Sequence, residues 1–451
     1  MIMNYLDRYR HALRTLPEGV SEAEVDAERR VSTMVKCSGG EIVETGSSDT
    51  TELFVRASGD KTGYAYTQDL EEEPEGVFTK ALRNSSQVEL TQRDRLNGAF
   101  VRRASPDGIA NSDIQSMKKI AGELENVVRD ADRYISSVTV EIRAEGFSRS
   151  VINSRGLDVE TSMSLYSATA SVMAEKNGLQ YNASCYSSAK EPDHLVLEGF
   201  KERIAADLSH QYEATEIGSG EYRVLLDSTV VTNILMTAWQ LFSGIKYNDG
   251  SSALSGRLGE AIGSPFFSVV DSPSHELTAY RYEFDCEGSP CVKQVLVDKG
   301  KLVGLMHNIS SATKLGVSSS GNAGRYALLS GSIPTDIIIT PRIIYVEPGS
   351  KSVGELLEEL GDGIYVTNSY DVFHSINIGS GWFSIPCRGT VIKGGIEDRN
   401  VTGMTMNGKL TNLFARVMAA GKDLYIEEFL RKSYCVGAPS LLIEKLQING
   451  K

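Results

Sequence analysis

The sequence predicts an α+β fold in two domains: an N-terminal antiparallel sheet backed by helices, then a mostly β C-terminal domain. Its 451 residues exceed the roughly 250 to 300 residues at which single cores stop growing. Its apolar patterns lack the regular strand–helix alternation of a doubly wound sheet. After a "GSGEY" turn at 218–222, the chain becomes richer in Gly and short β segments. We therefore expect domains at 1–217 and 218–451.

Each N-terminal element is predicted from its own pattern. Residues 28–57 contain strand-like runs with Gly and Ser turns, and a helix is expected near 75–84. Apolar residues recur at helical spacing after an Asn/Ser cap signal at 111–112. Residues 137–178 alternate like antiparallel strands, with a turn at "NSRG", 153–156. A further helix is expected at 198–214.

The second domain opens with a strand-like "YRVLLD" and then a helix expected at 228–247, with Ser228/Thr229 as its cap. After this helix, the apolar runs are short and are separated by Gly, Pro and Ser, as in β-rich domains. The expected strands lie in "SVVDSP", "CVKQVLVDKGKLVGLMHN", "TDIIITPRIIYVEPGS", "GIYVTN" and "GTVIKGG".

Composition limits the partners. Hydrophobic residues make up 41% and charged residues 23%, as in ordinary globular proteins. The formal net charge of −13 and the lack of a basic run argue against direct binding of nucleic acid. The charged amphipathic segment 1–16 differs from a signal peptide, and no apolar run approaches the roughly 18 residues of a membrane span. We expect a cytoplasmic protein, without a membrane partner, whose six scattered cysteines are reduced.

A search for common catalytic motifs does not identify an active site. His275/Glu276 is the only His-Glu dipeptide, no second His follows at metal-binding spacing, and a solvated loop histidine is the favoured interpretation. Cys387, with His374 upstream, could pair as a nucleophile and a base, although a small buried cysteine is favoured. Composition and spacing alone leave the function open.

A set of motifs in a fixed order is more specific. These motifs resemble the TldD/PmbA family, also called modulators of DNA gyrase, over almost the whole chain. The resemblance rests on "FVRASGDKTGYAYTQDL", "VINSRG", "GSGEYRVLLD", "SGRLGEAIGSPFFSVVDSP", "SATKLGVSSSGNAGR", "VEPGSKSVGELLEELGDGIYV" and "VGAPSLLIEKLQI".

The resemblance implies a zinc site that this chain lacks. In the TldD branch, the helix after the strand resembling 224–226 carries HExxxH, which supplies two zinc ligands and a catalytic Glu. Aligned without a gap, these positions are Met236, Thr237 and Leu241. A thioether is a poor zinc ligand, Leu is none, and Thr has no carboxylate to accept a proton. We read Met236, Leu241 and the intervening Trp239 as packing residues.

The third ligand of the active branch is a Cys ahead of a "VG.G.P" segment. Here Cys435 stands directly against "VGAP", too close, whereas Tyr425 is nearer the expected position. These departures resemble the PmbA branch, also called TldE.

Three function classes follow from the resemblance. The favoured class is a PmbA/TldE-like non-catalytic subunit of a TldD-type zinc metalloprotease, which binds unfolded or extended peptide and has no catalytic residue, metal or cofactor of its own. The second class is a stand-alone, homodimeric peptide-binding protein. The third is a hydrolase that uses the Cys387/His374 site. We expect a TldD-type partner, self-association, and no catalysis by the isolated chain.

Overall fold

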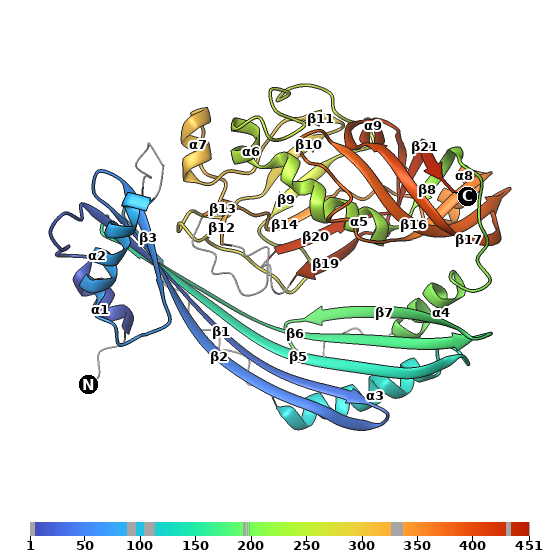
Figure 1. Cartoon of the computed structure of the whole chain (residues 1–451), viewed down its shortest axis with the longest axis horizontal. Coiled ribbons are helices and arrows are strands. Elements are labelled where there is room, and N and C mark those ends of the chain that lie inside the picture. The colour runs from blue at the N-terminus through green and yellow to red at the C-terminus, as the bar shows by residue number, and fades with distance from the viewer. Residues whose placement is uncertain are drawn as a thin grey trace.

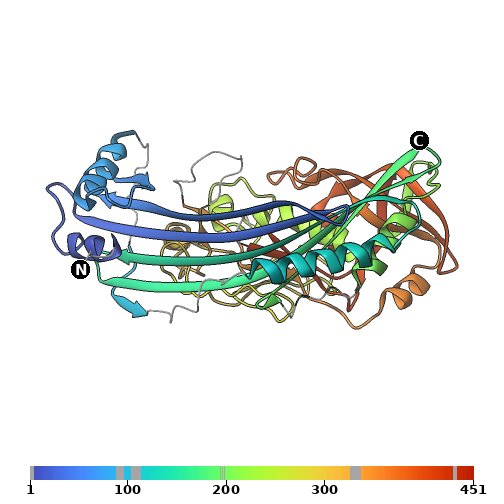
Figure 2. The same cartoon turned by 90° about the horizontal axis from the view of Figure 1, so that it is seen from below.

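The computed structural model describes residues 5–87, 96–102, 113–192, 195, 197, 199–325, 337–429 and 434–450. Figure 1 shows a long, curved N-terminal sheet whose concave side faces the C-terminal part of the chain. Helix α3 lies along the opposite, convex side, as the view from below in Figure 2 also shows. Helices and strands thus segregate as in an α+β protein, and the predicted fold class is confirmed.

The N-terminal sheet has the strand order β3-β2-β1-β5-β6-β4, and β7 also pairs with β6. All of these pairings are antiparallel except β4 with β6. The strands are β1 (Glu22–Ser38), β2 (Glu41–Ser58), β3 (Thr62–Thr67), β4 (Phe100–Arg102), β5 (Ile135–Asn153), β6 (Leu157–Lys176) and β7 (Leu179–Ala189). The helices of this part are α1 (Tyr5–Ala12), α2 (Pro74–Asn84), the 3-10 turn η1 (Ser85–Gln87), α3 (Ile114–Arg129) and α4 (Phe200–Ser209).

The alternation predicted for 137–178 decides which face of β5 meets the helices. Val140 and Ile142 of β5 are fully buried with Leu124 of α3, while the intervening Glu141 and Arg143 are partly exposed on the other face. A strand with this alternation buries one face against the helices and leaves more polar side chains on the other. The turn predicted at 153–156 joins β5 to β6.

The helices of this part differ from the predictions at their ends. Helix α3 is capped by Asp113, whose side chain accepts a hydrogen bond from the Gln115 N–H. The predicted cap residues 111–112 lie outside the described residues. Helix α4 is shorter than the predicted 198–214, and its N-cap is Gly199 with a positive φ of 83°.

The C-terminal part contains two larger sheets and one small one. One has the order β11-β10-β9-β14-β20-β19, and the other has the order β17-β16-β15-β8-β21-β18 with an added β17–β21 pairing that closes it into a ring. Strand β8 lies parallel to β15 and antiparallel to β21, so the first and last strands of this part pair directly. The strands are β8 (Gly220–Leu226), β9 (Val269–Ser272), β10 (Gln294–Asp298), β11 (Lys301–Leu302), β12 (Ala323–Gly324), β13 (Ile338–Ile339), β14 (Ile343–Val346), β15 (Gly363–Ser369), β16 (Trp382–Lys393), β17 (Ile396–Lys409), β18 (Val417–Ala420), β19 (Tyr425–Phe429), β20 (Tyr434–Ala438) and β21 (Leu441–Asn449).

Short helices connect these strands, and the helix predicted at 228–247 is wrong in its extent. The α-helix α5 ends at Ala238, a 3-10 turn follows, and a separate helix begins at Gly244. The N-cap of α5 is Asp227, whose side chain accepts a hydrogen bond from the Thr229 N–H, and the predicted cap Ser228/Thr229 is wrong. The helices are α5 (Ser228–Ala238), η3 (Trp239–Phe242), α6 (Gly244–Asn248), α7 (Ile309–Leu315), α8 (Val353–Leu360) and α9 (Leu410–Ala415). Among the described helices, none is both long and apolar enough to span a membrane.

Buried ion pairs join the two parts at one end of the long sheet. Arg56 on β2 is 1% exposed, and its guanidinium lies 2.6 Å from Glu24 of β1 and 3.4 Å from Glu287 of the C-terminal part. Asp26 on β1 lies between Arg149 of β5, at 3.1 Å, and Arg325 of the C-terminal part, at 3.3 Å. Charges this deeply buried are tolerated only when paired, so these pairs fix the register of one part on the other.

A second attachment lies where α4 meets the C-terminal sheet. Arg388 of β16 is 8% exposed and donates to Asp207 of α4 at 2.6 Å and to the Tyr370 hydroxyl at 2.5 Å. The side-chain amide of Asn400 on β17 donates to the carbonyls of Ser209, the last residue of α4, and of Tyr212, which lies just after that helix. These two sets of polar contacts attach the sheet to the C-terminal part, and apolar residues of β6 such as Leu165 pack against that part as well.

The ion cluster makes the stability of this junction depend on pH. Burial raises the pKa of Glu287 to about 8 and that of Asp26 to about 7, although nearby arginines act against burial. The folded state therefore binds protons that the unfolded state has released, so its stability falls as pH rises from about 5 toward about 8.

We predict that Glu287→Gln, which mimics the protonated acid, gains stability relative to the wild type as pH rises from about 6 to about 9. The measurement is the midpoint of thermal unfolding across that range. Glu358→Gln, at an exposed position of α8, is the control and should follow the wild type. Parallel curves for Glu287→Gln and the wild type would show that this carboxyl does not titrate in the junction.

Candidate functional site

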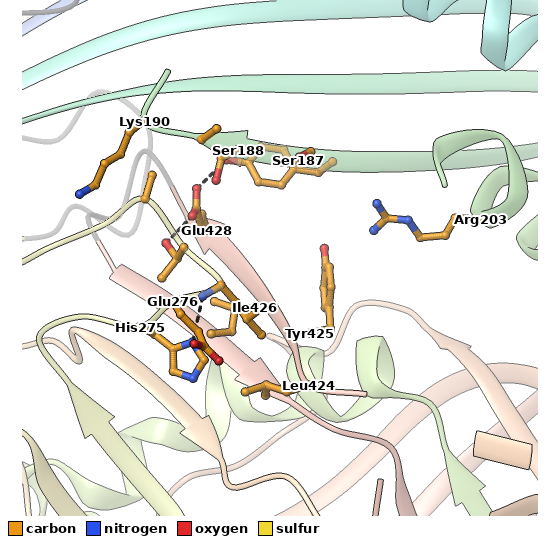
Figure 3. Close-up of a pocket in the computed structure, with 15 residues that line it drawn as sticks. Ser187, Ser188, Lys190, Arg203, His275, Glu276, Leu424, Tyr425, Ile426 and Glu428 are labelled. Atoms are coloured by element: carbon orange, nitrogen blue, oxygen red, sulfur yellow. Dashed lines mark hydrogen bonds between the residues drawn. The ribbon is translucent and has the colours of Figure 1, made fainter. Parts of the chain in front are cut away.

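A cleft of about 660 Å³ lies between the N-terminal sheet and the C-terminal part (Figure 3). Its walls come from β7 and the residue after it, from α4, from the loop after β9, and from β19 with the residue before it. The lining residues are Tyr186, Ser187, Ser188, Ala189, Lys190, Arg203, His275, Glu276, Leu277, Thr278, Ala279, Leu424, Tyr425, Ile426 and Glu428.

The cleft is bordered by two sheet edges. In the described part of the chain, β7 pairs only with β6, and β19 pairs only with β20. Residues 186–190 and 424–426 line the cleft consecutively, so the backbone edges, and not a single face of either strand, border the space. An unpaired edge offers a row of N–H and C=O groups to an added strand.

Glu428 connects the two walls. Its carboxylate accepts a hydrogen bond from the Tyr186 hydroxyl of β7 at 3.0 Å and a second one from the Thr278 hydroxyl of the facing loop. Glu428 is 7% exposed, so both of its oxygens are satisfied by protein groups. Burial, followed by the charge of Glu428, raises the pKa of Tyr186, which keeps this hydroxyl protonated as the donor. Glu428 acts as a structural bridge in this position.

His275 does not match the solvated loop histidine of the favoured interpretation. Its side chain is half-buried, its ring meets the Tyr345 ring edge-on at 4.9 Å, and its Nδ1 accepts from the Leu277 N–H at 3.2 Å. Burial lowers the pKa of His275, so the ring is neutral near pH 7. The structure places it, with the exposed Glu276, on the wall of the cleft. Sequence spacing gave no sign of this position, because the loop is brought there by β9.

The two positions aligned with the HExxxH ligands are built for packing. Leu241 is fully buried, lies in the 3-10 turn after α5, and belongs to the main core cluster together with Trp239. Met236 is half-buried on α5. A Met thioether and a Leu side chain do not supply the nitrogen, thiolate or carboxylate ligands that hold zinc.

The base position is also unsuited to its chemistry. Thr237 is 2% exposed, and its hydroxyl has no hydrogen-bond partner in the described structure. A neutral hydroxyl cannot take a proton from a zinc-bound water at neutral pH. Across the described residues, no group of three or more His, Cys, Asp or Glu side chains could hold a metal ion. The side chains at these positions therefore do not fit the zinc of the TldD branch.

The two candidates for the third ligand lie in different surroundings. Tyr425 begins β19 and lines the cleft, and its hydroxyl points toward β7 in Figure 3. Cys435 is fully buried on β20, where its Sγ lies 3.8 Å from the Thr278 hydroxyl. Burial raises the pKa of Cys435 well above its usual value, which disfavours the thiolate that a metal would need.

The Cys387/His374 pair has no support in this arrangement. Cys387 is 2% exposed in the core, and burial raises its pKa to about 12, so the thiol is neither accessible nor ionised. The His374 side chain is 75% exposed, and its Nδ1 lies 2.5 Å from an oxygen of Asp371. The buried structural cysteine is the interpretation that this environment favours.

Models of the PmbA/TldA metallopeptidase family match three regions of the chain. Its C-terminal domain matches residues 219–450, its domain 1 matches residues 23–85, and its central domain matches residues 108–210. The fold is thus that of a metallopeptidase-related scaffold. The chain belongs to the PmbA/TldD family.

Individual relatives agree with this assignment. A TldD homolog of Haemophilus influenzae is 24% identical over 88% of this chain and 86% of its own, and a PmbA homolog of the same organism is 23% identical over 76% and 71%. Both are described as metalloproteases. A metalloprotease of Methanothermobacter thermautotrophicus is 31% identical, but the match spans only 39% of this chain and 37% of that protein.

Solved structures share the fold. A proposed modulator of DNA gyrase from Thermotoga maritima has a TM-score of 0.84 at 24% identity and covers 99% of this chain and 100% of its own. TldE from Thermococcus kodakarensis has a TM-score of 0.82 at 20% identity and covers 98% and 100%. At these identities the similarity establishes the architecture and leaves the chemistry to the side chains described above.

The unpartnered hydroxyl at the base position gives a stability prediction. Thr237→Val keeps the shape and removes a buried polar atom without a partner, so the free energy of unfolding should rise by about 1 kcal/mol. The measurement is the urea midpoint. Thr232→Val is the matched control on the same helix: its hydroxyl donates to the Tyr425 carbonyl at 3.5 Å, so its loss should leave stability unchanged or lower. Destabilisation by Thr237→Val would show that this hydroxyl has a role that the packing does not reveal.

Proposed function

We propose that this chain is a PmbA/TldE-like, non-catalytic subunit that pairs with a TldD-type zinc metalloprotease in proteolysis or peptide processing. The observation that carries the proposal is the combination of a complete family scaffold with Met236, Thr237 and Leu241 at the ligand and base positions. A scaffold retained without its metal ligands is suited to a structural and binding role beside an active partner.

The ligand that we propose for the cleft is an unfolded or extended peptide. The two free edges at β7 and β19 support this, because an extended chain can add to an exposed edge through main-chain hydrogen bonds. Such bonds are independent of side-chain identity, as a subunit that handles varied peptides requires. The Ser187 and Ser188 side chains on one wall offer small polar groups that leave room for different residues.

We also propose self-association when the partner is absent, and a cytoplasmic location. Subunits of a chamber-forming protease leave apolar surface exposed when alone, which favours pairing with a second copy. Leu277 at the rim of the cleft, 53% exposed, is an apolar side chain of this kind. All six cysteines are unpaired, which is consistent with a reducing compartment.

The first experiment asks whether the chain carries its own metal. We expect elemental analysis of gently purified protein to find no stoichiometric zinc, because the aligned side chains cannot hold it. Restoring all three positions together, as Met236→His, Thr237→Glu and Leu241→His, should give only weak zinc binding, since the third ligand and its supporting contacts are still missing. About one zinc per wild-type chain would refute the alignment.

The second experiment tests the partnership. The isolated chain should not cleave unfolded peptides, whereas a mixture with a TldD-type partner from the same organism should, and a chelator should abolish that cleavage. Co-purification of an HExxxH-bearing relative in a pull-down from the native host would identify the partner.

Cys387→Ser is the control for the competing hydrolase hypothesis and should leave the mixture fully active, because Cys387 is buried. Cleavage by the isolated wild-type chain that survives the chelator and disappears in Cys387→Ser would reverse the assignment. Tight binding of unfolded peptide by a homodimer, with no relative captured, would instead favour the stand-alone peptide-binding protein.

A further inference from the structure

One end of the cleft carries a positively charged side chain without an ion-pair partner in the described structure. Arg203 is exposed on α4 and lines the cleft, and its guanidinium lies 5.6 Å from the centre of the Phe200 ring one turn earlier. Phe200 is fully buried, so this stacking holds the guanidinium over a fixed surface. The helix thus holds the positive charge in position, and no carboxylate of a described residue pairs with it.

A hydroxyl faces the same space from the opposite wall. Figure 3 shows the Tyr425 ring standing on β19 with its hydroxyl directed toward β7, and the Arg203 guanidinium extending from α4 toward it. The Tyr425 hydroxyl makes no hydrogen bond with another described residue. Burial, followed by the charge of the neighbouring Glu427, raises the pKa of Tyr425, and the charge on Arg203 acts in the opposite direction, so Arg203 and Tyr425 are within electrostatic range. The hydroxyl is therefore a protonated donor at neutral pH.

Glu428, an acid that also lines this part of the cleft, already has two hydrogen-bond partners. Glu428 accepts from Tyr186 and Thr278 and faces away from Arg203 in Figure 3. Arg203 and Tyr425 therefore present donors that no acceptor of a described residue takes up, at one end of a cleft whose borders suit an extended peptide. A guanidinium fork and a hydroxyl are the groups that bind a carboxylate through several charge-assisted hydrogen bonds.

We propose that Arg203 and Tyr425 form a carboxylate-binding subsite that sets the position of the bound peptide along the cleft. The inference rests on the proposed peptide-binding function and adds the chemistry that this end of the cleft recognises. The carboxylate can come from the C-terminus of the peptide or from an Asp or Glu side chain. Because the chain carries a net charge of −13, general electrostatics disfavour anionic peptides, so a preference for them must arise locally.

The test uses three versions of one unstructured peptide of about ten residues, labelled at its N-terminus, and fluorescence anisotropy with the full-length chain. One has a free C-terminus and no acidic side chain, one is amidated with a single Asp, and one is amidated with no carboxylate. We expect one or both carboxylate peptides to bind about tenfold more tightly than the third, as for a charge-assisted hydrogen bond. The peptide that gains identifies the source of the carboxylate.

The variants assign the preference to the subsite. Arg203→Gln should remove the advantage of the carboxylate, and Tyr425→Phe should reduce it. Lys201→Gln makes the same change of charge at an exposed position of the same helix that does not line the cleft, and should leave the advantage intact. Binding of the carboxylate-free peptide should change little in all three variants.

Two results would overturn the subsite while leaving peptide binding in place: equal affinity for all three peptides, or an equal effect of Lys201→Gln and Arg203→Gln, which would indicate bulk charge. If none of the peptides binds, the subsite and the peptide-binding part of the proposed function both fail. Cleavage by a mixture with the TldD-type partner is measured separately, so failure of the partnership can be told apart from failure of the subsite.

Discussion

The position of every cleft-lining group depends on the buried ion pairs that join the long sheet to the C-terminal part. The concave face of that sheet buries some apolar surface against the C-terminal part, where Leu165 packs with Val270 and Tyr280, but buried charges also lie in this junction. Arg56 contacts Glu24 on its own sheet and Glu287 on the other part. These contacts require one particular placement of the two parts, whereas apolar packing alone is less directional. Breaking the Arg56–Glu24 pair would leave an uncompensated buried charge, at a cost of about 3 to 5 kcal/mol.

Local pattern was enough to predict much of the N-terminal fold. The alternation around Ile142 and the turn at 153–156 are properties of adjacent residues, and the structure has both. The prediction of the helix starting near 228 was wrong at both ends, for different reasons. Asp227 caps it as well as Ser228 could, and sequence does not distinguish them. The change to a 3-10 turn places Leu241 and Phe242 in a core built from distant strands, which no local pattern reports.

The candidate site also has features that the sequence predicts and features that it does not. The alignment of Met236, Thr237 and Leu241 with the ligand and base positions rests on the family motifs and stays a prediction, whereas their burial is the burial expected of those residue types. The cleft could not be predicted. Tyr186 and Glu428 lie on strands of different sheets, and neither Arg203 nor Tyr425 belongs to a motif with a characteristic spacing. Their convergence depends on the two attachments between the parts, one of which uses Arg388 and Asp207.

The pairing of β8 with β21 sets the order in which the chain can fold during synthesis. Strands β1 to β7 find all of their partners among residues that emerge early, so the long sheet can form while the rest is still being made. In the ring of strands that contains β8, β8 cannot pair with β21 until the end of the chain has been made. Bringing together two strands so far apart in sequence costs conformational entropy and slows folding. Until then, the charged concave face and the edge of β7 are exposed to the cell. Leu165 and the unpaired edge of β7 are then open to non-native contacts, so aggregation of the nascent chain is the risk that this order of folding carries.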